Sequence, residues 1–364
     1  MSVKRTIGWR RTLAALFPLL LVAAACGGDD DDDASDTTAV TSDTSDSTGT
    51  TNGDPSGDLP GAGVSVGLAL PGPQNDKGFN QAHYNGILLA EEELGITSKV
   101  QENVADPDAR IDALRNLADG NELVIGVGAE FAEAGLTIAP QFPDVEFMII
   151  NGQTDEAVPN LHVYGVRQGV PAYIAGVVAA SGLIPDLAVD TVGYVGGEEI
   201  PPTTQSDDGM KAGVADTDDG IEYVSTIVGN FNDAPKAKEA AAAQLASGAD
   251  VIFGLVDAGF PGVIQAAEEA GGEAHLFSVI FPRCDDYPNL VGTAFLNSDV
   301  LVAQMVEDFL NDAVPAEPLY FGVENLDIQR LELCPSFQTE ELTALVDETT
   351  AGIVDGSIAL PEGV

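Results

Sequence analysis

Basic residues are scarce in this sequence of 364 residues, which holds 14 Lys and Arg against 59 Asp and Glu and has a formal net charge of −45. Four of the basic residues and no acidic residue fall in the first 25 positions, so the rest of the chain has a net charge of −49 from 10 basic and 59 acidic residues. Such a body repels nucleic acid and anionic membrane surfaces, so both are poor partners. A solvated acidic surface, as in proteins that work at high salt, explains the imbalance better than a calcium site, because the sequence has no EF-hand-like ligand run.

Histidines and catalytic motifs are also few. The chain has three His, and an acid–base enzyme would need one of them beside a nucleophile. His83 and Asp76 form a pair that is local in sequence, but the chain contains no Walker A loop, GxSxG elbow or HExxH motif. We therefore expect no enzymatic activity and no cofactor.

Only three Cys are present, and no CxxC or Cys/His metal spacing occurs among them, so we expect no metal site. Cys284 and Cys334 either pair as one disulfide in an oxidising compartment or remain separate, and the sequence leaves this open. No second apolar run of 18 residues follows the amino terminus.

The first 25 residues have a basic start, an uncharged run from Thr12 to Ala25 and small residues before Cys26. This pattern is typical of an export signal and is too short for a stable membrane span. It resembles a bacterial lipoprotein signal, which implies lipidation at Cys26 and anchoring on the extracytoplasmic side of the cell membrane, although Ala23 stands where Leu is more usual. The alternative is an ordinary signal peptide with an incidental Cys.

Residues 26–62 are rich in Asp, Ser, Thr and Gly and nearly lack apolar residues. They cannot bury enough surface to offset their ordering entropy, so we expect a disordered tether. As a flexible coil it would reach roughly 30 to 35 Å.

From residue 63 onward, apolar runs of strand length alternate with helical patterns at βαβ spacing, and the rhythm restarts near residue 190. This predicts an α/β protein of two Rossmann-like lobes with parallel sheets and a ligand cleft between them. We expect residues 63–185 plus about 295–325 in an N-terminal lobe, 186–290 in a C-terminal lobe and 326–364 packed across both. We also expect a strand at Leu290–Leu296 to lead back to the first lobe, and Asp233 to cap a helix that runs to Ala246.

The stretch from Leu70 to Gly86 is the predicted binding corner. Pro71-Gly72-Pro73 ends an apolar run, a polar loop follows, and apolar residues at helical spacing begin at Phe79. In open α/β sheets, ligands bind where a strand end meets a helix N-terminus. Asn75, Asp76, Phe79 and Asn80 are therefore candidate ligand contacts, although the first two would also serve as helix caps and Phe79 would also serve as a core residue.

Asp76-Lys77-Gly78-Phe79-Asn80-Gln81 followed by Gly86 resembles the opening motif of the BMP (basic membrane protein) or PnrA-like lipoproteins. The resemblance continues to about Met305, through Pro140-Gln141-Phe142-Pro143-Asp144, Gly196-Gly197 and Phe231-Asn232-Asp233. It implies a type I periplasmic-binding-protein fold whose members supply solutes to ABC importers, the best known binding purine nucleosides.

In nucleoside binders of this family, an aromatic residue from each lobe clamps the base, and Asp and Lys side chains hold the base edge and the ribose. Phe79 matches the first aromatic, whereas Ser206 stands at the second, Asn151 at an Asp, Ile280 or Phe281 at another Asp, and Leu296 at a Lys. Asp257, Phe260 and Arg283 are the available replacements, although Arg283 would also serve to balance local acids. The predicted ligand-binding residues are Asn75, Asp76, Phe79, Asn80, Gly128, Asn151, Ser206, Asp257, Phe260 and Arg283.

The sequence thus predicts a monomeric, membrane-anchored binding protein that delivers a small polar or heteroaromatic solute to an ABC permease, with nucleosides as the leading class. A surface-tethered sensor that uses the same cleft closure is the alternative, and the sequence does not separate the two.

Overall fold

The computed structural model describes residues 59–76, 78–152 and 157–364. The predicted signal, the lipidation site Cys26 and the predicted tether up to residue 58 lie outside these residues. The last four residues of the predicted tether differ from the expectation of disorder, because the Gly61 backbone N–H donates to the Leu94 carbonyl at 2.7 Å.

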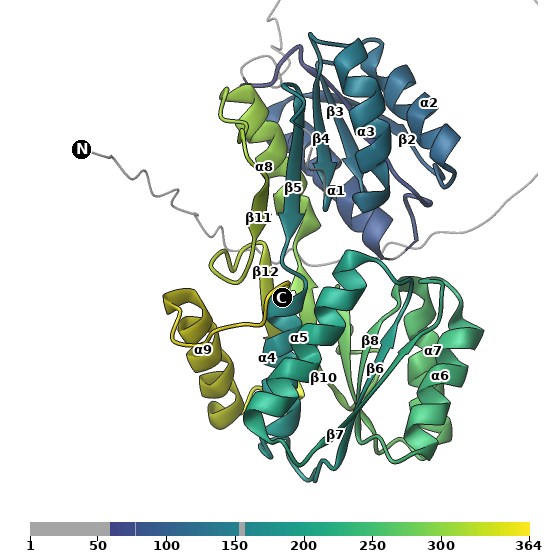
Figure 1. Cartoon of the computed structure of the whole chain (residues 1–364), viewed down its shortest axis with the longest axis vertical. Coiled ribbons are helices and arrows are strands. Elements are labelled where there is room, and N and C mark those ends of the chain that lie inside the picture. The colour runs from purple at the N-terminus through teal and green to yellow at the C-terminus, as the bar shows by residue number, and fades with distance from the viewer. Residues whose placement is uncertain (1–58, 77, 153–156) are drawn as a thin grey trace, which may run out of the picture. The chain divides into compact units, whose positions relative to one another are not determined.

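The N-terminal lobe is built on a six-stranded parallel sheet of order β11-β5-β4-β3-β1-β2. Its strands are β1 (Ser65–Ala69), β2 (Thr97–Gln101), β3 (Leu123–Val127), β4 (Glu146–Ile150), β5 (Leu161–Val166) and β11 (Leu319–Phe321). Its helices are α1 (Phe79–Leu94), α2 (Pro107–Ala118), α3 (Ala132–Ile138) and α8 (Ser298–Leu310). Figure 1 shows α8 and β11, from late in the chain, beside strands from the first half.

Both faces of this sheet are buried, and alternate residues of one strand serve different faces. Leu68 belongs to an apolar cluster with residues of α1 and α8, whereas its neighbour Ala69 belongs to a cluster with residues of α2 and α3. The near-continuous apolar runs of the sequence follow from this two-sided burial.

The C-terminal lobe has a second six-stranded sheet of order β12-β10-β9-β8-β6-β7, parallel except that β12 runs antiparallel to β10. Its strands are β6 (Thr191–Gly196), β7 (Glu222–Ile227), β8 (Val251–Leu255), β9 (His275–Ile280), β10 (Leu290–Leu296) and β12 (Gln329–Leu333). Its helices are α4 (Gly169–Ala180), α5 (Pro201–Thr217), α6 (Ala234–Ala246), α7 (Phe260–Glu269) and α9 (Glu340–Asp355).

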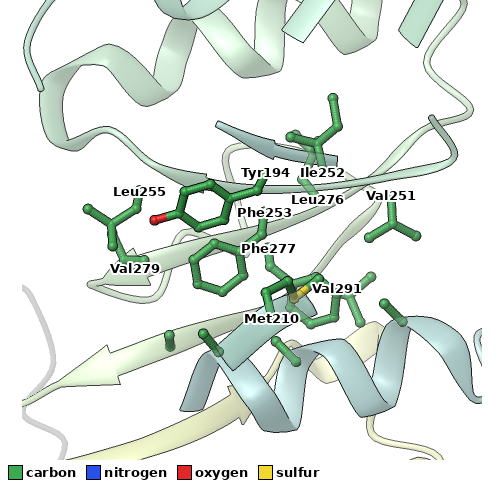
Figure 2. Packing of buried hydrophobic residues seen from close by; sticks show 14 of the residues in the cluster. Tyr194, Met210, Val251, Ile252, Phe253, Leu255, Leu276, Phe277, Val279 and Val291 are labelled. Carbon is green, nitrogen blue, oxygen red and sulfur yellow. The ribbon is translucent and has the colours of Figure 1, made fainter. Parts of the chain in front are cut away.

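Aromatic rings fill the centre of this lobe (Figure 2). The ring of Phe253 stacks between Tyr194 and Phe277, with centroid distances of 5.7 and 6.4 Å. The α6 helix begins as predicted, since the Asp233 carboxylate accepts a hydrogen bond from the Lys236 backbone N–H at 3.1 Å. That cap prediction is confirmed.

Helix α4 lies in the C-terminal lobe, so the predicted first-lobe boundary at 185 is wrong. A Cβ on Gly213 of α5 would lie 2.1 Å from the Tyr173 carbonyl of α4, and one on Gly176 of α4 would lie 2.3 Å from the Met210 carbonyl. The two helices therefore pack backbone to backbone. Every residue of α4 is buried, so its sequence had no polar face to indicate which sheet it covers.

Two further boundary predictions are also wrong. Strand β10 pairs with β9, so the predicted return to the first lobe begins only after Leu296. Residues 326–364 were expected to pack across both lobes, but β12 joins the second sheet and α9 packs against α4. A disulfide joins Cys284, after β9, to Cys334, after β12, with 5.5 Å between the two Cα atoms.

The chain crosses between the lobes three times, after β5, after β10 and after β11. The Arg167 N–H donates to the Phe321 carbonyl at 2.8 Å, and the Asn297 N–H donates to the Ile328 carbonyl at 2.7 Å. These bonds tie the three crossovers to one another. Within the described residues, the helices are all too short or too polar to span a bilayer.

Candidate functional site

The loop between β1 and α1 is organised by the carboxylate of Asp76. Its Oδ1 accepts from the backbone N–H of Gly78 (2.8 Å) and Gln81 (3.0 Å), and its Oδ2 accepts from the Asn80 N–H (3.1 Å) and the Asn80 side-chain amide (2.6 Å). Asp76 thus caps the first turn of α1 with four hydrogen bonds. Of the two roles open in the sequence, the structure displays the capping role.

Asn80 is 8% exposed, and its amide is used within the same loop. Besides the bond to Asp76, its Oδ1 accepts from the Gly72 N–H at 3.0 Å. Asn80 was predicted as a ligand contact, and in the structure its amide group bonds within the loop. Asn75 is exposed.

Phe79, the first residue of α1, packs against the apolar clusters of both lobes. Its ring lies 4.3 Å from that of His83, whose Nδ1 donates to the Phe79 carbonyl at 2.7 Å. His83 is fully buried, and burial lowers its pKa to about 4. The imidazole behind Phe79 is therefore neutral near pH 7.

Three predicted residues of the C-terminal lobe meet this corner. A Cβ on Gly78 would lie 3.2 Å from Cβ of Asp257, which opens the short 3₁₀ turn after β8. The guanidinium of Arg283 lies 5.6 Å from the centroid of the Phe260 ring, and its Nη1 lies 3.7 Å from the Asp286 carboxylate. Gly78, Asp257, Phe260 and Arg283 thus line one gap between the lobes, together with Gly254, Val279 and Ile280.

Among the residues that line this gap, Asp257 has a strongly shifted pKa. Burial, together with the nearby Asp76 carboxylate, raises its pKa to about 7, while Arg283 opposes the shift. The gap is closed in this structure, since its lining residues leave no room for a molecule the size of water. Ligand pockets usually measure about 300–1,000 Å³, so a solute needs the lobes or side chains to move apart.

Ile280 ends β9 with φ of 69° and lines the same gap. A β-branched residue in this left-handed region costs about 1–3 kcal/mol, and such strain concentrates at binding sites. In the sequence, this position stood out only because Ile280 or Phe281 occupies the place of an Asp in the family motif.

A second group of charges lies at the end of β3. The Glu130 carboxylate lies against Gly128, whose φ is 111°, and burial raises the Glu130 pKa, with Arg110 opposing and Glu198 adding to the shift. Glu198 follows β6, so acids from both lobes interact here. Arg110 lies 5.9 Å from the Phe131 ring centroid and donates to the Ala105 carbonyl.

Two of the predicted ligand contacts, Ser206 and Asn151, form hydrogen bonds within the protein. Ser206 is 1% exposed and donates to the Gln168 carbonyl at 3.3 Å, so it lies in the packing of α5 and does not supply a surface for a ring. Asn151, with φ of 59°, accepts from the Val166 N–H through Oδ1 at 3.0 Å and so joins the ends of β4 and β5. The burial of Ser206 depends on which helix packs against α5, and the spacing of residues along the chain does not reveal that helix.

Sequence reasoning missed Arg110, Glu130, Glu198 and Phe231. The Phe231 ring contacts the position that a Cβ on Gly197 would occupy, at 2.1 Å, so an aromatic does lie at the second lobe's corner. Both Glu130 and Phe231 stand in motifs that the sequence displays. They would have been predicted if the loop after every strand had been considered as part of the binding site. Within the described residues, no set of three His, Cys, Asp or Glu is arranged to hold a metal ion.

Comparisons with known proteins agree with this geometry. The family model described as ABC transporter substrate-binding protein PnrA-like (Bmp) matches residues 63–354. Basic membrane protein D of Borreliella burgdorferi is 27% identical over 253 residues, covering 68% of this chain and 72% of the relative. A purine-binding protein of Brucella abortus is 28% identical over 214 residues, covering 58% and 59%.

Among solved structures, a solute-binding protein of an ABC transporter system from Aeropyrum pernix aligns with a TM-score of 0.71 at 21% identity, covering 82% of this chain and 94% of that one. The predicted type I periplasmic-binding-protein fold is confirmed by this likeness and by the two six-stranded sheets. The family model spans most of the chain and both lobes that enclose the gap. The chain belongs to the PnrA-like (Bmp) family of ABC transporter substrate-binding proteins.

Proposed function

We propose that this chain is an extracytoplasmic lipoprotein, anchored at Cys26, that binds a small heteroaromatic solute and delivers it to an ABC importer. One observation carries the proposal: strand ends of both lobes converge on the gap between Gly78 and the group Asp257, Phe260 and Arg283. This is where open α/β sheets bind ligands. The family assignment and the export-type amino terminus support the transport role.

Binding would work through lobe closure. The three crossovers are joined by two backbone hydrogen bonds, and their few residues would absorb the hinge rotation. A solute that contacts both lobes favours the closed form by the difference in its affinity for the two forms, and the permease would recognise that form. Because the gap has no room for a water-sized molecule in this structure, entry of a solute requires opening.

The chemistry of the gap favours a flat, polar ligand. Among the lining residues, Phe260 supplies a ring, and Arg283 and Asp257 supply a donor and an acceptor of hydrogen bonds. Phe79 follows the lining residue Gly78 and would supply a second ring once the lobes open. Nucleosides are the first class to test, since a relative is named for purine binding. Ser206 and Leu296 do not supply the second aromatic or the Lys of the family pattern, so ribose contacts would have to come from groups such as Asp257.

Native mass spectrometry of the purified full-length protein, followed by identification of the co-purified molecule, tests this proposal. Calorimetric titration then compares variants. Phe79→Ala should weaken binding more than tenfold, since it removes a stacking face, while Phe309→Ala on α8 is the matched control and should leave affinity unchanged. Equal affinities of the two variants would show that the site is elsewhere, and binding of another solute without nucleosides would remove the nucleoside class.

A further inference from the structure

The connection between β9 and β10 differs from the connections that precede it in the C-terminal sheet. Strands β6 to β9 are joined in succession through α5, α6 and α7. Strands β9 and β10 are joined by residues 281–289, all of which the structure describes and none of which is helical. Parallel strands usually need a crossover of about a dozen residues or more, most often with a helix that packs on the sheet. This loop lacks such a helix, so its position depends on other attachments.

Arg283 lies in this loop and reaches the gap between the lobes. Among the described residues that line the gap, Arg283 alone is basic. Its side chain is 15% exposed, and its guanidinium lies 5.6 Å from the centroid of the Phe260 ring. Its positive charge also opposes the rise in the Asp257 pKa that burial causes. Arg283 is therefore the lining group that would donate to an acceptor on the solute.

The residue after Arg283 is attached covalently to another strand. The disulfide joins Cys284 to Cys334, which directly follows β12. Cys334 is itself held firmly, because it is 2% exposed and its backbone N–H donates to the Val291 carbonyl at 2.9 Å. The disulfide thus ties the backbone beside Arg283 to the edge of the sheet.

Hydrogen bonds attach the other end of the loop. The Tyr287 hydroxyl donates to the Ala274 carbonyl, and the Asn289 amide donates to the Gly272 carbonyl, both at 3.0 Å. Both acceptors precede β9, so these bonds fix the residues that lead into β10. The disulfide attaches the end that leaves β9, where Arg283 lies.

The backbone before Arg283 is strained. Ile280 has φ of 69°, and a β-branched residue keeps this conformation only where the surrounding structure enforces it. The disulfide fixes Cys284, four positions later, and so limits how far the strained turn can relax. Without this anchor, the turn would relax and carry Arg283 away from the Phe260 ring.

We propose that the Cys284–Cys334 disulfide positions Arg283 in the binding gap, so that solute affinity depends on the oxidation state of this pair. The inference rests on the proposed function, because it assigns the disulfide a role in that binding site. Cys284 is partly exposed, so a small dithiol reaches it. Dithiothreitol transfers two electrons and two protons to the S–S bond, which gives two thiols, and is itself oxidised to a cyclic disulfide.

The first test needs no solute. The chain has eight Arg, so full-length protein labelled with ¹⁵N in Arg gives at most eight Nε–H signals, and Arg283→Lys assigns one of them. Dithiothreitol should shift the Arg283 signal, because the guanidinium leaves the Phe260 ring. The signal of Arg115, which pairs with Asp112 in the N-terminal lobe, should stay in place.

The signal of Arg330 shows whether the sheet remains folded after reduction. Arg330 lies on β12, 4.0 Å from the centroid of the Phe295 ring on β10, and its signal should not move. If it does move, the comparison is repeated in trimethylamine N-oxide, which favours the folded state.

The second test measures affinity by calorimetric titration with guanosine. Reduction should weaken binding about tenfold, as expected for one lost hydrogen bond to a charged group. Arg283→Ala should weaken binding by a similar factor, and reduction of this variant should cause no further loss, because both changes remove the same contact. Gly213→Ala, which strains the same lobe at the α4–α5 contact, is the matched control and should retain the affinity of the unmodified protein.

Three results would each overturn the proposal: an unmoved Arg283 signal in the reduced, folded protein, equal guanosine affinities before and after reduction, or a full loss on reduction in Arg283→Ala. Failure of guanosine to bind the oxidised protein would instead count against the nucleoside class. In that case the Arg283 signal still decides the positioning role, since it is measured without a solute.

Discussion

The two lobes share a strand order but are held together differently. In the C-terminal lobe, α4 and α5 touch through Gly176, Gly209 and Gly213, and a disulfide closes the far edge of the sheet. In the N-terminal lobe, α1 and α8 meet at Gly86, and the binding corner is held by hydrogen bonds to Asp76. The comparison indicates that the second lobe depends on close backbone packing and covalent closure, and the first on a polar network that also shapes the ligand site.

Removal of the disulfide should produce the largest effect. The double variant Cys284→Ser, Cys334→Ser frees a loop with a sequence separation of 50 residues and should lower the free energy of unfolding by about 4 kcal/mol on the chain-entropy model. Hydrogen exchange should show the loss in β9, β10 and β12, while β1 and β3 keep their protection. An equal loss of protection in both lobes would contradict the inference that the disulfide stabilises the C-terminal lobe in particular.

Replacement of the buried glycines should have the next largest effect on stability. Gly213→Ala places a methyl group 2.1 Å from the Tyr173 carbonyl and should cost about 2–3 kcal/mol, because backbone atoms cannot yield easily. Gly86→Ala should cost about 1–2 kcal/mol, since its nearest atoms, Cβ of Val302 at 2.8 Å and the Ser298 carbonyl oxygen at 2.9 Å, leave more room than the 2.1 Å at Gly213. Gly220→Ala, an exposed control whose nearest atom is an Asp218 side-chain oxygen, should change stability little in urea titrations. Equal costs for the two buried glycines would remove this difference between the lobes.

The buried His83 makes the first lobe sensitive to acid. Its folded pKa, about 4, lies below the unfolded value of 6.5, so the unfolded state binds more protons and stability falls as pH drops from about 6.5 to about 4. The full loss is up to about 3 kcal/mol. In denaturation series across this range, His83→Gln should flatten the slope. An unchanged slope in His83→Gln would assign the acid response elsewhere.

A further prediction concerns the Asp257 carboxylate of the gap. The folded pKa of Asp257, about 7, lies above the usual 3.8, so its contribution to stability is complete below about pH 4 and is lost as pH rises to about 7. Asp257→Asn should therefore raise stability at pH 8 by up to about 4 kcal/mol and change it little at pH 4. Asp285→Asn, on the neighbouring exposed loop, serves as the control in thermal scans. A gain of the same size at both pH values would show that repulsion from Asp76 is not the cause.

Much of the fold followed from local pattern. The strand predicted at Leu290–Leu296 has those bounds in the structure, and the helix predicted after Asp233 ends at Ala246, because a bounded apolar run and a capping residue are strong signals. Lobe membership was less predictable. The α4 helix is apolar all round, so its pattern fits either sheet, and only the glycines of α5 place it.

The candidate site divides in the same way. Asp257, Phe260 and Arg283 were predicted as replacements for missing residues of the family pattern, and the structure gathers them with Gly78 around one gap. Ser206 was predicted as a ligand contact from the family motif alone. In the structure its side chain is buried and donates to the Gln168 carbonyl. Glu130 and Glu198 interact only because two loops 68 positions apart are brought together, which spacing along the chain does not express.

The sequence by itself determined the alternation of strands and helices, the family and the corner from Leu70 to Gly86, because each depends on residues that are neighbours in the chain. The tertiary structure alone decided that Cys284 meets Cys334 and that Asp257 of the C-terminal lobe lies against Gly78 of the N-terminal lobe. These outcomes depend on distances between segments, which are set by the packing of whole helices and sheets.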